Sequence, residues 1–449
     1  MKIVLILISC FVLTITPVFV WAEDSNNVEE DPFATSEADM FSESETLEDV
    51  QEYQDEEIDD QIKKGSIGVS AELNGSAVYN SIREELKKPP YERNDSYSAS
   101  IEGDLFLDLR WKYGMKIFGD VYAVHTPIKE TGLKEEQKSQ IDEKDYAVFA
   151  RELFGDVNIA HKVYFRIGKQ TLKWGQGYLW NPTDLINIDR KEFTDIEARR
   201  EGSYGLKMHI PFGTALNIYT FINTTDTKNS DESALAGKVE FLVLGDIEMS
   251  VSGWTKKDYK PVYGLDIAAY GLGTYWRGEL SLTQGGNQHY LEKQNDFYVD
   301  SYDSDEFISQ LVMGFTRSFD IGDINDRFSL TGEFLYNPKG YEENMFEDIT
   351  LKTQFLAGHY YVPSYYGKYY AAVFTTFRRF LGNTDLTFSA NAINNLSDSS
   401  SLVMTNLNYV ATFETSIKVG LSATIGEENR EFTLLGNSNS ANVSFSMVF

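Results

Sequence analysis

From residue 65 onward, apolar and polar side chains alternate with a period of two, and no run of about 20 apolar residues follows. One stretch places Ile101, Gly103, Leu105, Leu107, Leu109 and Trp111 on one face and Glu102, Asp104, Phe106, Asp108 and Arg110 on the other. A period of two is that of a β-strand. The chain is therefore predicted to be all-β and to lack helical membrane spans.

The connections between the predicted strands alternate in length. Connections after odd-numbered strands are mostly long, at 81–95, 126–144, 173–201, 285–305, 338–366 and 426–439. Connections after even-numbered strands are mostly tight, as around Gly213, Gly245 and Gly271. Outer-membrane barrels have short periplasmic turns and long external loops. Residues 63–449 are therefore predicted to form a transmembrane antiparallel β-barrel of about 18 strands (roughly 16–18).

The two ends of the chain predict export to a bacterial outer membrane. Lys2, an apolar run over 3–20 and Ala22 before Glu23 are typical of a signal peptide, expected to span residues 1–22. Cys10, the only cysteine, lies in that segment, so no disulfide or thiolate site is expected. The final alternation up to Phe449 resembles the C-terminal signature that barrel-assembly machinery reads. Expected partners are this machinery, outer-membrane lipid and lipopolysaccharide.

Residues 23–62 form an acidic segment with 17 Asp and Glu residues and no Lys or Arg. Such a composition cannot offset the entropy of ordering, so a disordered periplasmic tail is expected. The alternative is a segment that docks on a basic patch or on a periplasmic partner. The formal net charge of the chain is −29, and no basic cluster indicates nucleic-acid binding.

The most distinctive local motif runs from Tyr164 to Asp184. It resembles a pattern, R-x-G-K-Q-x-x-x-W-G-x-G followed by N-P-x-D, of porin-like Gram-negative outer-membrane barrels, with the alginate-export barrels as looser relatives. The matching positions are Arg166, Gly168, Lys169, Gln170, Trp174, Gly175, Asn181, Pro182 and Asp184. The resemblance covers about twenty residues closely and implies the fold rather than a substrate.

Residues 173–201, which follow this strand, have two possible placements. They could fold inward and constrict the lumen, as a long porin loop does. Alternatively, they could form an external loop that places Trp174, Tyr178 and Trp180 in an aromatic girdle. The sequence leaves both possibilities open.

The strands predict charges of both signs inside the barrel, which indicates a solvated lumen. Facing acidic and basic walls would select polar solutes, or neighbouring charges would simply pair across strands. Either Arg378 or Arg379 would add to the basic wall. The candidate lumen or constriction residues are Lys162, Arg166, Gln170, Trp174, Asn181, Asp184, Glu102, Asp104, Asp108, Asp120 and Arg277.

The expected function is an outer-membrane channel that passes polar solutes or exports a polymer or lipid. The alternative is a non-conducting assembly or surface-attachment barrel that binds polysaccharide or partner proteins. Its platform would be a tyrosine cluster that could equally form an aromatic belt: Tyr360, Tyr361, Tyr365, Tyr366, Tyr369 and Tyr370. None of the five histidines lies in a known catalytic motif, so no enzyme, cofactor or metal site is expected.

Overall fold

The computed structural model describes residues 66–449 apart from several short gaps. The gaps are residues 85–86, 89–92, 112–113, 131–144, 173, 187–190, 192, 195, 197, 226, 286, 288–289, 295–296, 302–305, 343, 359 and 435. The predicted signal peptide (1–22) and acidic tail (23–62) lie outside the described residues. No helix in the described part of the chain is long and apolar enough to cross a membrane.

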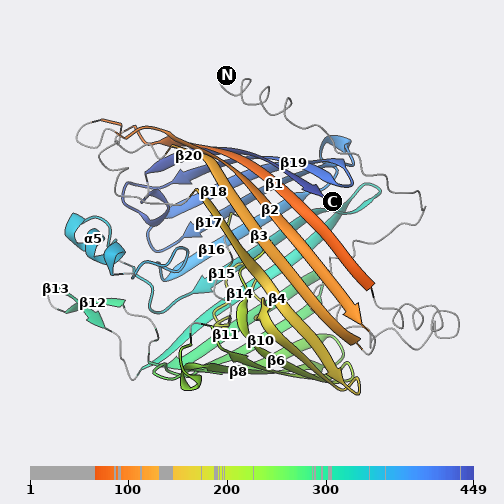
Figure 1. The fold of residues 1–449 in the computed structure, drawn as a ribbon. Helices are drawn as coiled ribbons and strands as arrows, with labels where there is room; N and C mark the ends of the chain where they lie inside the picture. Colours follow the sequence, from red (N-terminus) through yellow and green to blue (C-terminus); the bar gives the residue numbers. More distant parts are fainter. Residues whose placement is uncertain are drawn as a thin grey trace. The chain divides into compact units, whose positions relative to one another are not determined.

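Eighteen strands form one closed antiparallel barrel, which confirms the predicted fold class (Figure 1). The first eleven are β1 (Ser66–Ile82), β2 (Ser96–Trp111), β3 (Met115–Glu130), β4 (Tyr146–Ile159), β5 (Val163–Gln170), β6 (Ser203–Phe212), β7 (Leu216–Asn223), β8 (Ala234–Val243), β9 (Ile247–Thr255), β10 (Val262–Gly271) and β11 (Thr274–Gln284). The remaining seven are β14 (Phe307–Ile321), β15 (Ile324–Tyr336), β16 (Tyr369–Phe377), β17 (Leu386–Asn395), β18 (Ser400–Thr412), β19 (Thr415–Ile425) and β20 (Asn437–Val448).

Each barrel strand pairs with the next, and the last strand returns to the first. The register between β1 and β20 runs from Glu72 opposite Val448 to Ile82 opposite Asn437. The orange β1 and the blue β20 therefore meet in Figure 1. Closure leaves no free sheet edge, so the backbone of every barrel strand is paired on both sides.

The barrel exposes apolar side chains outward and buries polar side chains inward. On β2, Leu105 is 53% exposed and Leu107 is 38% exposed, whereas Asp104 and Asp108 are buried. This is the reverse of a soluble domain, which turns its apolar face inward. It matches a barrel wall with an apolar band toward lipid and a polar interior.

The long connections contain small elements of their own on one side of the barrel. The β11–β14 connection forms a hairpin, β12 (Tyr290–Gln294) and β13 (Phe297–Ser301), and the β15–β16 connection contains helix α5 (Ile349–Ala357). The sequence analysis treated both as plain loops. Leu291 of β12 packs with Phe346 and Phe355 from the α5 region, so the two connections share one apolar cluster.

Within the described residues, three short 3-10 turns complete the elements. They are η2 (Ser230–Glu232) between β7 and β8, η3 (Phe380–Gly382) between β16 and β17, and η4 (Glu431–Thr433) between β19 and β20. η4 packs near the long loops, and η3 lies at the end with the short turns. Most connections at the first end of the barrel are long and most at the other end are short, as the sequence predicted.

Candidate functional site: the inward segment

Residues 171–202, here called the inward segment, connect β5 to β6, and described residues of this segment pack against the inner wall of the barrel. Trp180 is fully buried and lies in one cluster with Leu335 of β15 and Tyr370 of β16. The Trp180 and Tyr370 ring centroids are 5.8 Å apart. Nearer its start, the segment packs Trp174 against Phe221 of β7. Of the two placements that the sequence left open, the structure has the inward one.

Glu279 of β11 holds the part of the segment that includes the glycine-rich turn. Its side chain is buried on the inner wall, two residues from Arg277 and on the same face of the strand. Its carboxylate accepts hydrogen bonds from Gln176 N (3.1 Å), Gly177 N (3.2 Å), Thr183 N (2.7 Å) and Thr183 Oγ1 (2.6 Å). Four hydrogen bonds converge on this one buried carboxyl group, so Glu279 attaches the segment firmly to the wall.

Glu333 of β15 holds the adjoining part of the segment. Its carboxylate accepts from three successive backbone amides, Tyr178 N (2.5 Å), Leu179 N (2.9 Å) and Trp180 N (2.8 Å). Arg277 lies beside it, with Nε 3.8 Å from Glu333 Oε2, and compensates the buried charge. The segment is thus attached to two strands of the wall through its backbone.

Further contacts brace the segment internally. Lys191 Nζ donates to the carbonyl oxygens of Gly177 (2.8 Å) and Tyr178 (2.9 Å). Asp184 pairs with Arg200 at 3.0 Å. The Asp184 amide also donates to the carbonyl of Asn181 at 3.1 Å, so the N-P-x-D part of the motif is a turn.

Arg277 is among the predicted lumen residues, whereas Glu279 and Glu333 are not. Strand alternation alone could have placed Glu279 inward, because it lies two residues after Arg277. Alternation also places Glu333 with Thr331 and Leu335 on the buried face of β15. Nothing in either strand indicates that the carboxylates bind a connection more than 90 residues away in sequence.

The predicted acidic residues of β2 and β3 lie on the inner wall. Asp104, Asp108 and Asp120 are buried, and Glu102 is half-buried with its carboxylate 3.5 Å from Ser100 Oγ. Asp104 forms an ion pair with Arg151 of β4. Asp108 pairs with Lys116 (3.2 Å) and Arg110 (3.1 Å).

Arg199 of the inward segment reaches this acidic wall. Its guanidinium lies 2.6 Å from Glu72 Oε2 and 3.7 Å from Asp104 Oδ2. It also stacks over the Phe106 ring at 4.5 Å. The segment is therefore bound to the acidic wall at one end as well as to Glu279 and Glu333 in its middle.

The lumen residues predicted in and just before β5 have different environments. Arg166 is buried and forms an ion pair with Asp156 of β4 at 2.8 Å, and buried Gln170 donates to the carbonyls of Arg166 and Gly205 at 3.4 Å. Lys162 differs from the expectation that it faces the lumen, since it lies exposed in the tight turn between β4 and β5. The chain reverses direction there, so alternation no longer fixes which way a side chain points.

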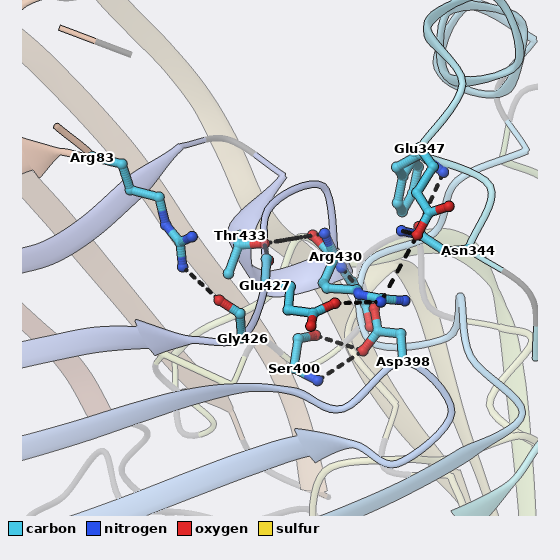
Figure 2. Close-up of polar contacts among 11 residues, drawn as sticks. Arg83, Asn344, Glu347, Asp398, Ser400, Gly426, Glu427, Arg430 and Thr433 are labelled. Carbon is cyan, nitrogen blue, oxygen red and sulfur yellow. Dashed lines mark hydrogen bonds and ion pairs between the residues drawn. The ribbon is translucent and has the colours of Figure 1, made fainter. Parts of the chain in front are cut away.

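Polar contacts also join the long connections to one another (Figure 2). Arg83, after β1, donates to the carbonyl of Gly426 at 3.0 Å. Arg430, before η4, contacts Glu427 at 2.7 Å and Glu347, before α5, at 3.8 Å. The loops that follow β1, β15 and β19 are therefore linked.

The tyrosines predicted as a belt or a platform occupy three environments. Tyr361 and Tyr366 pack in the apolar loop cluster with Phe346 and Phe355. Tyr370 is fully buried on the inner wall. Tyr369 lies on the opposite face of β16, where it packs against Tyr336 at 5.6 Å. Among the described residues, no group of His, Cys, Asp or Glu side chains could hold a metal ion.

Several solved structures have a similar fold, among them a porin. The chain is similar to Acinetobacter baumannii OccAB1 (TM-score 0.54, 10% identity, covering 85% of this chain and 96% of that one). It is also similar to a BenF-like porin from Pseudomonas fluorescens Pf-5 (TM-score 0.53, 11% identity, 86% and 98%) and to Pseudomonas aeruginosa OccK9 (TM-score 0.53, 9% identity, 86% and 98%). Neither a family model nor a curated protein matches the sequence. At these identities the likeness shows the fold.

Proposed function

We propose that the chain is an outer-membrane channel that passes small polar solutes through a lumen narrowed by the inward segment. The observation that carries this proposal is a closed barrel whose inner wall bears ion pairs and holds a connection by Glu279 and Glu333. Charges inside a barrel need water or partners. The apolar outer face supports a location in a membrane, and the porin fold of the similar structures supports a pore.

The proposal covers small solutes rather than export of a polymer or a lipid. The inward segment is bound to three parts of the wall, through Glu279, Glu333 and the Arg199 contacts. A polymer would need these contacts to break together. A small solute would pass beside a segment that stays in place.

Conductance in planar lipid bilayers tests the proposal. We expect the purified protein to produce stable open steps. A variant in which residues 176–200 are replaced by a short glycine-serine turn should give larger steps, because the deleted residues narrow the lumen. Gln170 and Ser203 are already paired, so a short turn can reconnect β5 and β6 without moving either strand.

A matched control removes residues 290–301, the β12–β13 hairpin, which belongs to a different connection. This deletion should change the step size less than the replacement of 176–200. Larger steps only after that replacement would support the constriction. Silence of both the wild type and the 176–200 variant would instead favour a non-conducting barrel, for which the complete burial of Trp180 in the lumen is the supporting observation.

A further inference from the structure

A cavity of about 340 Å³ lies between the inward segment and the long loops. Asn181, Pro182 and Asp184 of the N-P-x-D turn line one side of it. Its volume falls at the lower end of the roughly 300–1,000 Å³ typical of small-molecule sites. The N-P-x-D turn of the sequence motif therefore borders a cavity that is large enough for a small solute.

Aromatic rings from three separate connections form much of the cavity wall. Trp254 at the end of β9 and Tyr259 after it meet edge to face, with centroids 5.8 Å apart and planes at 87°. Tyr290 comes from the β11–β14 connection, and Tyr360 and Tyr365 come from the β15–β16 connection. Rings at right angles present flat apolar faces on more than one side of a bound molecule.

Neutral amides supply the polar part of the lining. Gln310 Nε2 donates to Asn337 Oδ1 at 3.0 Å, and Asn337 Nδ2 donates to the carbonyl of Tyr365 at 2.8 Å. These two hydrogen bonds hold both side-chain amides in place at the cavity wall. They leave the Gln310 carbonyl without a hydrogen-bond partner among the described residues, so that oxygen can accept from a ligand hydroxyl.

The two charged side chains at the cavity are already compensated. Asp184 is paired with Arg200 at 3.0 Å. Lys339 Nζ donates to the Tyr290 hydroxyl at 3.1 Å and lies 3.9 Å from Glu306. A charged ligand would have to give up its hydration here without gaining an unpaired opposite charge. The lining therefore favours an uncharged ligand.

We infer that this cavity binds uncharged, hydroxyl-bearing ring compounds, that is, small neutral sugars. Aromatic faces pack on the C–H faces of a sugar ring, and fixed amides bond its hydroxyls. The inference rests on the proposed function for its role as the place where solutes are selected before the inward segment. Binding itself does not require an open pore.

Isothermal titration calorimetry on the full-length protein in detergent tests the inference, with D-glucose and maltose as probes. Gluconate, glucosamine and benzoate serve as comparisons, because they add an anion, a cation or an aromatic anion. We expect saturable binding of at least one neutral sugar and affinities for the charged compounds that are weaker by about tenfold or more. Equal or tighter binding of a charged compound, or no binding of either sugar, overturns the inference.

Tyr259→Ala should weaken sugar binding by about tenfold, which corresponds to the loss of one aromatic packing contact. The matched control is Tyr263→Ala on β10, because Tyr263 is 58% exposed and does not line the cavity. If the Tyr259 variant does not fold, Gln310→Leu provides the same test through the amide. An equal loss of binding in the Tyr263 variant would contradict the assignment.

The calorimetric and conductance experiments fail independently. Sugar binding without open steps would leave the cavity assignment standing and overturn the channel. Open steps without sugar binding would support the channel and overturn the cavity assignment.

Discussion

At the scale of single residues, three buried glutamates attach connections to the barrel wall, Glu279 and Glu333 from the strands and Glu431 from a connection. Glu279 and Glu333 hold the inward segment, and Glu431 of η4 accepts from Ser364 N (2.8 Å), Tyr370 Oη (2.7 Å) and Asn395 Nδ2 (2.8 Å). A buried carboxylate is costly to desolvate unless donors surround it. The hydrogen bonds to these residues therefore determine where the connections pack in the folded protein.

Glu431 makes the packing of the loops dependent on pH. Burial raises the pKa of Glu431 to about 7, above its ordinary value of 4.5, and Asp398 adds to the effect. A raised pKa means that the folded protein binds the proton more tightly than the unfolded chain. The stability that the folded loops gain from protonated Glu431 is complete below pH 4.5, and it is lost as the pH rises through 7.

Hydrogen exchange of residues 363–367 and 431–434, corrected for intrinsic rates, should therefore show protection that falls between pH 5 and 7. At its steepest, the protection factor should fall about tenfold for each pH unit. In a Glu431→Gln variant the side chain stays neutral, so the corrected protection should be nearly flat over this range. The same slope in the variant would show that another group is responsible.

At the scale of elements, β5 departs from strict alternation at its end. Arg166 is buried and Ile167 is 57% exposed, but Lys169 and Gln170 are both buried. Gly168 between them has a φ of 132°. A side chain there would place its Cβ 2.2 Å from the carbonyl oxygen of Leu153. The glycine of the motif therefore allows the strand to turn toward the inward segment.

Gly168→Ala should destabilise the barrel by about 1–3 kcal/mol, because the new Cβ meets backbone and the positive φ strains any other residue. The matched control is Gly237→Ala on β8, where the Cβ would lie 3.8 Å from the nearest atom, the Tyr219 carbonyl oxygen. Urea unfolding followed by tryptophan fluorescence measures both variants. A Gly168 variant as stable as the Gly237 variant would show that the strand does not need this glycine.

At the scale of the whole barrel, closure joins strands from the two ends of the described chain. Ser76 of β1 lies opposite Ser444 of β20, and the terminal Phe449 exchanges backbone hydrogen bonds with Ala71 at 2.8 and 3.1 Å. The sequence predicted a transmembrane antiparallel barrel of about 18 strands. The structure confirms that architecture.

A cysteine pair tests closure directly, because Cys10 is the only native cysteine and can be replaced by serine. Opposite side chains on paired strands are close enough for a disulfide, so Ser76→Cys with Ser444→Cys should cross-link under mild oxidation. The cross-link should shift the denatured protein on a gel run without reductant. Ser76→Cys with Ser389→Cys on β17 is the control, and efficient cross-linking of that pair would contradict the strand order.

The sequence by itself determined the barrel, its strand number, the length pattern of its connections and the inward face of β2. These follow from a period of two and from loop lengths, which are local properties of the chain. The tertiary structure alone decided that residues 174–186 lie inside and that Glu279 and Glu333 hold them. Alternation predicts which way a side chain points within a strand. It does not predict which distant connection that side chain will contact. For the same reason the sequence predicted Lys162 in the lumen, whereas the structure has it exposed in a turn where alternation ends.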